Sequence, residues 1–414
     1  MRLVLLLAFA LASLLAAQPV GAQVSPTVTD GGVENGFPDE IVFLVSAESD
    51  SPIERIRLRY TVLPDGTTAI AEADVEPGTT VSARFVLETN NPPSIYLSPG
   101  TTIEYRWEVT DADGDMATTE TATFFYDDVR FDWSSVEADG VTVFFYSGSD
   151  GDARAMLAAA SETIATMSDL LATSVDFPVN VWIYRSTNDM QPTLQRRSET
   201  YEQSVTTAGV RVASDTVLVL GNVSFDTLRH ELTHVVTAVA GEGPFGTLPA
   251  WLDEGTAVYG QSSPGDFGDA VERAVGRGNL LSIRSISSYP GNPDNVNLFY
   301  GESWSLVSYL IDTYGTGSFA RLFAEIQGGE STGDALIAVY GVDQDGLDDE
   351  WRVSLGLAPR NQPEPTEAPP LDIEPTGDDD GRPSTTLILV LLAGLLGLAG
   401  VVALAGLTLA RRVR

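Results

Sequence analysis

The chain has 414 residues, which is enough for two or three domains with cores of their own. It contains no cysteine, so disulfides and thiolate metal sites are excluded and any metal ion must use nitrogen and oxygen ligands. The net charge is −35 and every Lys/Arg-type cation is an arginine, so the surface repels nucleic acid phosphates and anionic membranes. Such acidity suits high-salt surroundings, and the missing lysine is equally consistent with GC-rich coding.

Residues 1–22 are typical of a secretory signal peptide. An apolar run from Leu3 to Ala17 follows an arginine, and a small-x-small site ends at Ala22. We expect cleavage after Ala22. The apolar run is also long for a signal peptide, so an N-terminal anchor is the alternative.

Residues 23–130 predict an all-β, immunoglobulin-like or fibronectin-like sandwich. Short runs alternate apolar and polar residues, and turn residues such as Pro64-Asp65-Gly66 separate them. Period-two runs with turns between them are typical of an antiparallel sandwich. Because there is no cysteine pair, the sequence leaves the strand topology open. The clearest runs are Ile56–Val62, Val81–Leu87, Ile103–Val109 and Thr118–Tyr126.

Two aspartate-rich segments contain part of a calcium-loop pattern. Asp111–Asp115 lies between two predicted strands, where the alternation on both sides favours an Asp-Gly hairpin turn over a calcium site. Asp343–Asp348 lacks one acid of the calcium pattern and better suits a loop that leads into a capped helix. We therefore favour the turn and the capped helix.

Residues 131–360 predict an α+β catalytic domain. A helix is expected from about Asp226, and from there to Gly356 the sequence is almost wholly helical. Strands mixed with helices, followed by helices alone, argue for this fold class. The expected elements before Asp226 are a strand at Val141–Tyr146, a helix at about 152–172, a strand at Val179–Tyr184, a helix near Asn188–Arg196 and a strand at Thr216–Leu220.

The C-terminal part of the chain predicts a membrane anchor. Residues 361–384 are rich in proline and acids and cannot bury a core, so we expect an extended stalk. Residues 385–410 include the uncharged run Leu387–Ala410, which is long enough for a single transmembrane helix. The arginines of the tail 411–414 would stay in the cytoplasm, so we expect a single-pass cell-membrane protein with its ectodomain outside.

The segment Leu228–Val236 contains both histidines of the chain, in the pattern His-Glu-x-x-His. Residues four apart share a face of a helix, so His230 and His234 can direct two imidazoles at one metal ion. Glu231 stands beside them, where it can reach a water molecule on that ion. The alternative is a helix with two incidental histidines.

A catalytic zinc ion takes three protein ligands and one water molecule, so a third ligand is needed. The segment Leu248–Ala257 resembles the W-L-x-E-G segment of gluzincin metallopeptidases, whose glutamate is the third zinc ligand. This resemblance implies Glu254. Asp253 is the neighbouring acid, but it points about 100° further around the helix. The gap from the histidines is one residue longer than in aminopeptidase-N-type enzymes, which the glycine-rich loop Gly241–Gly246 can absorb.

Residues 131–355 as a whole resemble the peptidase MA-like (gluzincin, aminopeptidase-N-like) family of zinc metallopeptidases. Phe299–Leu310 is similar to the helix that carries the catalytic tyrosine in aminopeptidase-N-like enzymes. By this resemblance Tyr300 is an oxyanion donor, and a tyrosine that only packs on the helix is the alternative.

The resemblance implies a zincin-type fold with one zinc ion that activates a water molecule. His230, His234 and Glu254 would hold the ion. Glu231 would accept the proton of the water during attack on a peptide carbonyl and pass it to the leaving amine. The substrate would be a peptide or protein.

One departure from the family bears on the substrate. The Gly-x-Met-Glu-Asn segment that grips a free N-terminus in aminopeptidases is not found, so we expect an endopeptidase rather than an aminopeptidase. The strand Thr216–Leu220, just before the histidine helix, is a candidate edge for pairing with an extended substrate. Two other functions remain open: a cell-surface binding or adhesion protein with a structural or vestigial zinc site, and a hydrolase of a non-peptide bond. The sequence does not indicate the oligomeric state.

Overall fold

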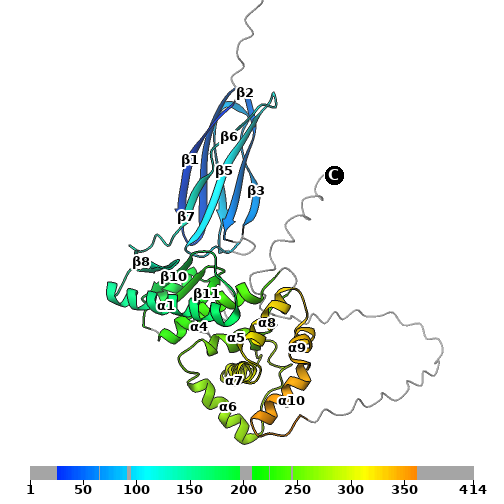
Figure 1. Cartoon of the computed structure of the whole chain (residues 1–414). Coiled ribbons are helices and arrows are strands. Elements are labelled where there is room, and N and C mark those ends of the chain that lie inside the picture. Colours follow the sequence, from blue (N-terminus) through cyan, green and yellow to red (C-terminus); the bar gives the residue numbers. More distant parts are fainter. Residues whose placement is uncertain are drawn as a thin grey trace, which may run out of the picture. The chain divides into compact units, whose positions relative to one another are not determined.

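The structure is a computed structural model of the chain, and it describes residues 26–64, 66–90, 95–195, 208–222, 224–243 and 246–360 (Figure 1). The chain divides into two compact units, the first ending at Val129 and the second beginning at Arg130, with Leu97–Gly100 belonging to the second. The expected signal peptide, stalk, transmembrane helix and tail lie outside the described residues. Within those residues, every helix is too short or too polar to cross a membrane.

The first unit is a β-sheet structure in which neighbouring strands pair antiparallel. The long strand β2 changes partners along its length. Its first part, up to Glu48, lies between β1 and β4, whereas its last part, from Arg55, lies between β3 and β5. The strands are β1 (Thr27–Gly36), β2 (Glu40–Leu63), β3 (Thr67–Ala73), β4 (Gly78–Glu88), β5 (Thr101–Asp111), β6 (Met116–Thr118) and β7 (Ala122–Tyr126).

The alternation of residue types explains why these segments are strands. On β5, Ile103, Tyr105, Trp107 and Val109 are buried, and the residues between them are not. Successive side chains of a strand point to opposite faces, so one face packs into the core and the other meets solvent.

The segment between β5 and β6 is a turn, as the sequence predicted. The Asp111 carboxylate accepts hydrogen bonds from the backbone N–H groups of Asp113 (3.1 Å) and Asp115 (3.0 Å), and Gly114 has a φ of +86°. Asp343 caps a helix, again as predicted, because its side chain accepts a hydrogen bond from the Gly346 N–H (2.9 Å).

The second unit begins with a mixed five-stranded sheet in the order β11-β12-β10-β9-β8. The three central strands are parallel, and β8 and β11 run antiparallel to their neighbours at the edges. Because β12 pairs with β10 on one side and β11 on the other, the prediction that it forms an edge for substrate is wrong: among the described residues, β11 is the edge strand on that side of the sheet. The bounds are β8 (Ser134–Ala138), β9 (Val141–Phe145), β10 (Val179–Tyr184), β11 (Gly209–Ala213) and β12 (Thr216–Leu220).

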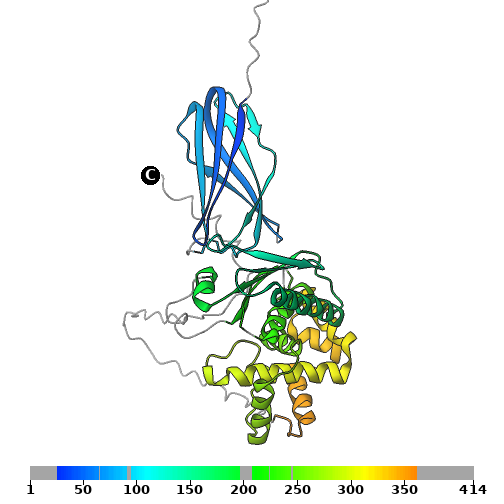
Figure 2. The ribbon, with the colours of Figure 1, turned by 90° about the vertical axis from the view of Figure 1, so that its left-hand side faces the viewer.

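Helices α1 and α4 lie side by side along one face of this sheet (Figures 1 and 2). Their apolar residues, among them Leu157 and Leu232, share a buried cluster with the valines of the central strands. The later helices pack around α7, where Trp251, Phe299 and Trp351 are fully buried. The helices are α1 (Asp150–Leu171), α2 (Thr187–Met190), α4 (Phe225–Gly241), α5 (Ala250–Tyr259), α6 (Asp266–Arg277), α7 (Val296–Tyr314), α8 (Thr316–Gln327), α9 (Thr332–Tyr340) and α10 (Gln344–Ser354), with short 3-10 turns at Gln191–Thr193 and Pro293–Asn295.

Candidate metal centre

Helix α4 carries the His-Glu-x-x-His segment. Its residues Leu228, Leu232 and Val235 recur at helical spacing and are fully buried, so they fix the helix against the sheet. His230 and His234 then fall on a neighbouring face of the helix, where their side chains are only 13% and 12% exposed.

Helix α5 carries Glu254 and begins directly after Pro249. Next to Glu254, Gly255 faces the backbone of α7, and a Cβ at this position would overlap the carbonyl oxygen of Ser303. Only glycine permits this approach of the two helices. The contact places Glu254 on a rigid element, with its carboxylate directed toward α4.

Three ligand atoms from α4 and α5 converge. The Nε2 atoms of His230 and His234 lie 3.2 Å apart, and Glu254 Oε2 lies 3.1 Å from the first and 3.4 Å from the second. A tetrahedral zinc site with ligand distances of about 2.0–2.1 Å has edges of about 3.3–3.4 Å between its ligand atoms. The chemistry and the spacing of the three groups therefore fit one zinc ion.

The two adjacent acids of α5 have different partners. Whereas Glu254 faces the two Nε2 atoms, Asp253 Oδ1 lies 2.9 Å from Nδ1 of His234 and also accepts a hydrogen bond from Thr237 Oγ1 (2.6 Å). Burial alone would raise the pKa of Asp253, but the charge and hydrogen bond of His234 lower it. Burial likewise opposes protonation of His234, but Asp253 and Glu254 raise its pKa well above the ordinary value. Asp253 thus contacts His234 on its Nδ1 side, whereas Glu254 faces the Nε2 side.

His230 has a neutral partner that the sequence patterns did not indicate. The side-chain amide nitrogen Nε2 of Gln261, just after α5, lies 3.0 Å from Nδ1 of His230. A histidine that binds zinc through Nε2 carries its proton on Nδ1, so the Gln261 amide must turn by about 180° to accept that proton with its oxygen. In that flipped orientation the amide suits the tautomer that a metal requires.

Glu231 is bound to the edge strand. Its Oε2 accepts a hydrogen bond from the backbone N–H of Arg211 on β11 (3.0 Å). The strand comes close to α4 here because Gly209 has no side chain: a Cβ would lie 2.8 Å from Thr227 and 3.1 Å from Glu231. One oxygen of Glu231 is thus held by the sheet.

Tyr300 lies on α7 beside the histidines. Its ring centroid is 6.0 Å from that of His230, and the ring stacks on Phe267 at 5.1 Å. The structure therefore brings His230, His234 and Glu254 together and places Tyr300 next to them.

Tyr289 is a further residue at the centre that sequence reasoning missed. It lies in the irregular segment between α6 and α7, where no motif marks it, and its hydroxyl donates a hydrogen bond to Glu254 Oε1. Removal from water, together with the Glu254 charge, raises the pKa of Tyr289. The hydroxyl therefore stays protonated and remains a donor.

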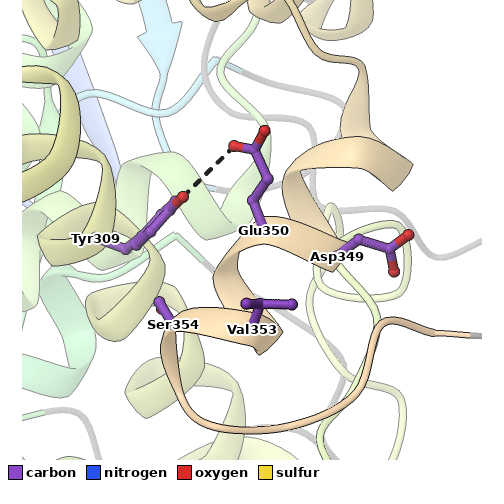
Figure 3. A pocket seen from close by; sticks show the side chains of 5 residues that line it. All are labelled: Tyr309, Asp349, Glu350, Val353 and Ser354. Carbon is purple, nitrogen blue, oxygen red and sulfur yellow. Dashed lines mark hydrogen bonds between the residues drawn. The ribbon is translucent and has the colours of Figure 1, made fainter.

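A separate hollow of about 390 Å³ lies on the surface of α7 and α10 (Figure 3). Its lining residues are Tyr309, Asp349, Glu350, Val353 and Ser354, and Tyr309 donates a hydrogen bond to Glu350 (3.4 Å). It shares no residue with the cluster around His230.

Three solved structures are loosely similar to this chain. An M1 zinc metallopeptidase from Deinococcus radiodurans is 13% identical, with 80% of this chain and 92% of that chain covered and a TM-score of 0.38. OgpA from Akkermansia muciniphila is 13% identical over 25% of this chain and 29% of that chain, with a TM-score of 0.19. BhCBM56 is 18% identical over 24% of this chain and 91% of that chain, with a TM-score of 0.18. No curated protein matches the chain.

The family comparison covers the metal centre. Residues 159–356 match the model of the Peptidase MA superfamily. The matched segment contains α4, α5 and α7, and with them the residues that converge around His230. Residues 159–356, which cover slightly less than half of the chain, are thus similar to the Peptidase MA superfamily.

Proposed function

We propose that the chain is a zinc metallopeptidase that hydrolyses peptide bonds. The observation that carries this proposal is the convergence of two imidazole nitrogens and one carboxylate oxygen at 3.1–3.4 Å. His230, His234 and Glu254 would hold one zinc ion and leave a position for water. The match of residues 159–356 to the Peptidase MA superfamily supports the same function.

When bound, zinc lowers the pKa of a water molecule and polarises a carbonyl. Glu231 would take the proton of that water, because Oε2 is held by the Arg211 N–H and Oε1 is left to act as the base. The same carboxyl would then return the proton to the leaving amine. Tyr300 would donate a hydrogen bond to the oxyanion from its place beside His230.

We further propose that an extended peptide pairs with β11. Among the described residues this strand pairs only with β12, so its outer edge offers backbone donors and acceptors. Glu231 is bound to the same strand, which would bring the peptide to the base. With no Gly-x-Met-Glu-Asn segment to grip a free N-terminus, internal cleavage is the better fit.

We also propose that the first unit is an immunoglobulin-like sandwich, with β1, β4 and the first part of β2 opposing β3, β5 and the last part of β2. The partner exchange along β2 supports this arrangement. The composition of residues 1–22 and 385–410 supports export and single-pass anchoring, with the two units outside the cell.

Cleavage of a diverse peptide library by the zinc-supplemented full chain tests the function. We expect cuts at internal bonds, and a loss of about 10²- to 10⁴-fold in rate for Glu231→Gln with zinc binding kept. Equal cleavage by the parent and Glu231→Gln would contradict the mechanism. Zinc binding without any peptide cleavage would favour the binding-protein or non-peptide hydrolase alternatives.

A further inference from the structure

We propose that Tyr289 is a positioning residue for the metal centre: its hydroxyl holds one oxygen of Glu254 so that the other stays directed at the ion. This inference rests on the proposed function. Tyr289 would not touch the substrate's reacting atoms or the ion, and would act through Glu254.

The two oxygens of Glu254 have separate partners. Oε2 faces His230 Nε2 (3.1 Å) and His234 Nε2 (3.4 Å), whereas Oε1 accepts the hydrogen bond from the Tyr289 hydroxyl. Glu254 is only 4% exposed, so little water is available to replace a lost donor. A hydrogen bond to the outer oxygen of a ligating carboxylate fixes its orientation and favours binding through the inner oxygen alone.

The segment that carries Tyr289 is fastened close to the tyrosine. The carbonyl oxygen of Ser287 accepts a hydrogen bond from the N–H of Ala250, the first residue of α5 (3.1 Å). Ser287 Oγ also accepts one from the Gln344 amide of α10 (3.3 Å). Because Ala250 is the first residue of the helix that carries Glu254, this hydrogen bond fixes the position of the Tyr289 hydroxyl relative to the Glu254 carboxylate.

A second contact fastens the same segment to α10. The guanidinium of Arg284 binds Asp345 with two hydrogen bonds, Nε to Oδ1 at 2.6 Å and Nη2 to Oδ2 at 2.8 Å. At the other end, the Tyr289 ring packs on Phe299 of α7, with centroids 5.6 Å apart. Tyr289 as a residue is 47% exposed, but its hydroxyl is bound to the buried carboxylate of Glu254.

The test is the zinc affinity of full-length Tyr289→Phe, measured by competition with a chelator. We expect the zinc Kd to rise by about 10- to 100-fold, which is typical when the partner of a metal ligand is lost. The melting temperature of the metal-free variant should match that of the parent, because the ring and its packing on Phe299 are kept. The visible spectrum of the cobalt(II)-loaded variant should also change, since a released carboxylate can bind through both oxygens.

Tyr314→Phe is the matched control. This tyrosine on α7 also donates to a glutamate, Glu350 Oε2 at 2.5 Å, but that glutamate does not belong to the metal centre. Its loss should leave the zinc Kd unchanged. If Tyr289→Phe binds zinc as tightly as the parent, or if Tyr314→Phe weakens binding equally, the inference is overturned while the proposed function stands. If the parent itself binds no zinc, both are overturned.

Discussion

The adjacent acids Asp253 and Glu254 show how one residue step on a helix separates two chemical roles. The step of about 100° sends Glu254 toward the two Nε2 atoms and Asp253 toward Nδ1 of His234. The histidine spacing could be interpreted from helix geometry alone. The choice between the two acids depended on the family pattern, because a sequence does not show how α5 is rotated against α4.

Gln261 and Tyr289 could not be identified from helix geometry or from the family pattern. Both contact side chains of the proposed metal centre, His230 and Glu254 respectively, from positions outside any helix. Irregular segments have no period from which a direction can be inferred. Only the folded packing of the segment around Ser287 brings Tyr289 to Glu254.

Glu302 is a buried carboxyl on α7 whose titration should affect stability. It is fully buried; its Oε1 accepts a hydrogen bond from the Leu281 N–H (2.9 Å), and its Oε2 has no partner among the described residues. Burial, reinforced by the nearby Asp348 charge, raises the pKa of Glu302 to about 8, although Leu281 N–H, Arg360 and Arg352 act in the opposite direction.

The sign of the effect follows from proton binding. The folded chain keeps Glu302 protonated up to about pH 8, whereas the unfolded chain loses this proton near pH 4.5. Between these values the folded state binds more protons, so Glu302 lowers the free energy of unfolding as the pH rises, by at most about 1.4 kcal/mol per pH unit. We predict that Glu302→Gln removes this part of the pH dependence and is the more stable form at about pH 8. Urea unfolding of the parent and of Glu302→Gln between about pH 4.5 and pH 8 measures this difference. If the free energy of unfolding depends on pH in the same way in both proteins, the prediction is wrong.

Among the secondary-structure elements, strands made of continuous apolar runs could be predicted from the sequence, whereas the short edge strands could not. The sequence predicted β9, β10 and β12 because each is a run of apolar residues. It missed β8 and β11, because each has only one buried residue among five and therefore lacks the apolar run that marks the central strands.

The wrong prediction that Thr216–Leu220 is an edge strand also follows from the weak sequence signal of β11. All five residues of Thr216–Leu220 are buried, and a continuous apolar run is typical of a central strand covered on both faces. The apolar run therefore favoured an interior strand, contrary to the prediction of an edge, and the sequence contains no strong signal for the strand β11 that pairs with β12 on its outer side.

Gly255 gives a prediction about the packing of two helices. A Cβ here would overlap the Ser303 carbonyl oxygen, so Gly255→Ala must push α5 away from α7 and lower the free energy of unfolding by about 1–3 kcal/mol. Thermal unfolding measures this change. Gly276→Ala on α6 is the control, because a Cβ there meets no atom within 4 Å and should be neutral or stabilising by up to about 1 kcal/mol. Equal melting temperatures for Gly255→Ala and the parent would refute the packing argument.

At the scale of the whole molecule, the sequence predicted a β region followed by a mixed and then a helical region, and the structure has this order. Period-two alternation and helical spacing are local properties, so they carry this information. The assignment of Leu97–Gly100 to the second unit is not local, and no pattern indicated it. The expected export and anchoring depend on residues 1–22 and 385–410, which lie outside the described residues.

In the proposed metal centre, His230, His234 and Glu254 of the folded chain together hold one zinc ion. Equilibrium zinc titration of the full-length protein tests this arrangement. We predict that one zinc ion binds per chain. The zinc Kd should rise by about 100-fold or more in Glu254→Ala, because the loss of a whole ligand costs more than the 10- to 100-fold loss that is typical for the partner of a ligand. The zinc Kd should be almost unchanged in Glu231→Gln. A parent chain that binds no zinc at neutral pH, or a Glu254→Ala variant that binds as the parent does, would contradict this arrangement.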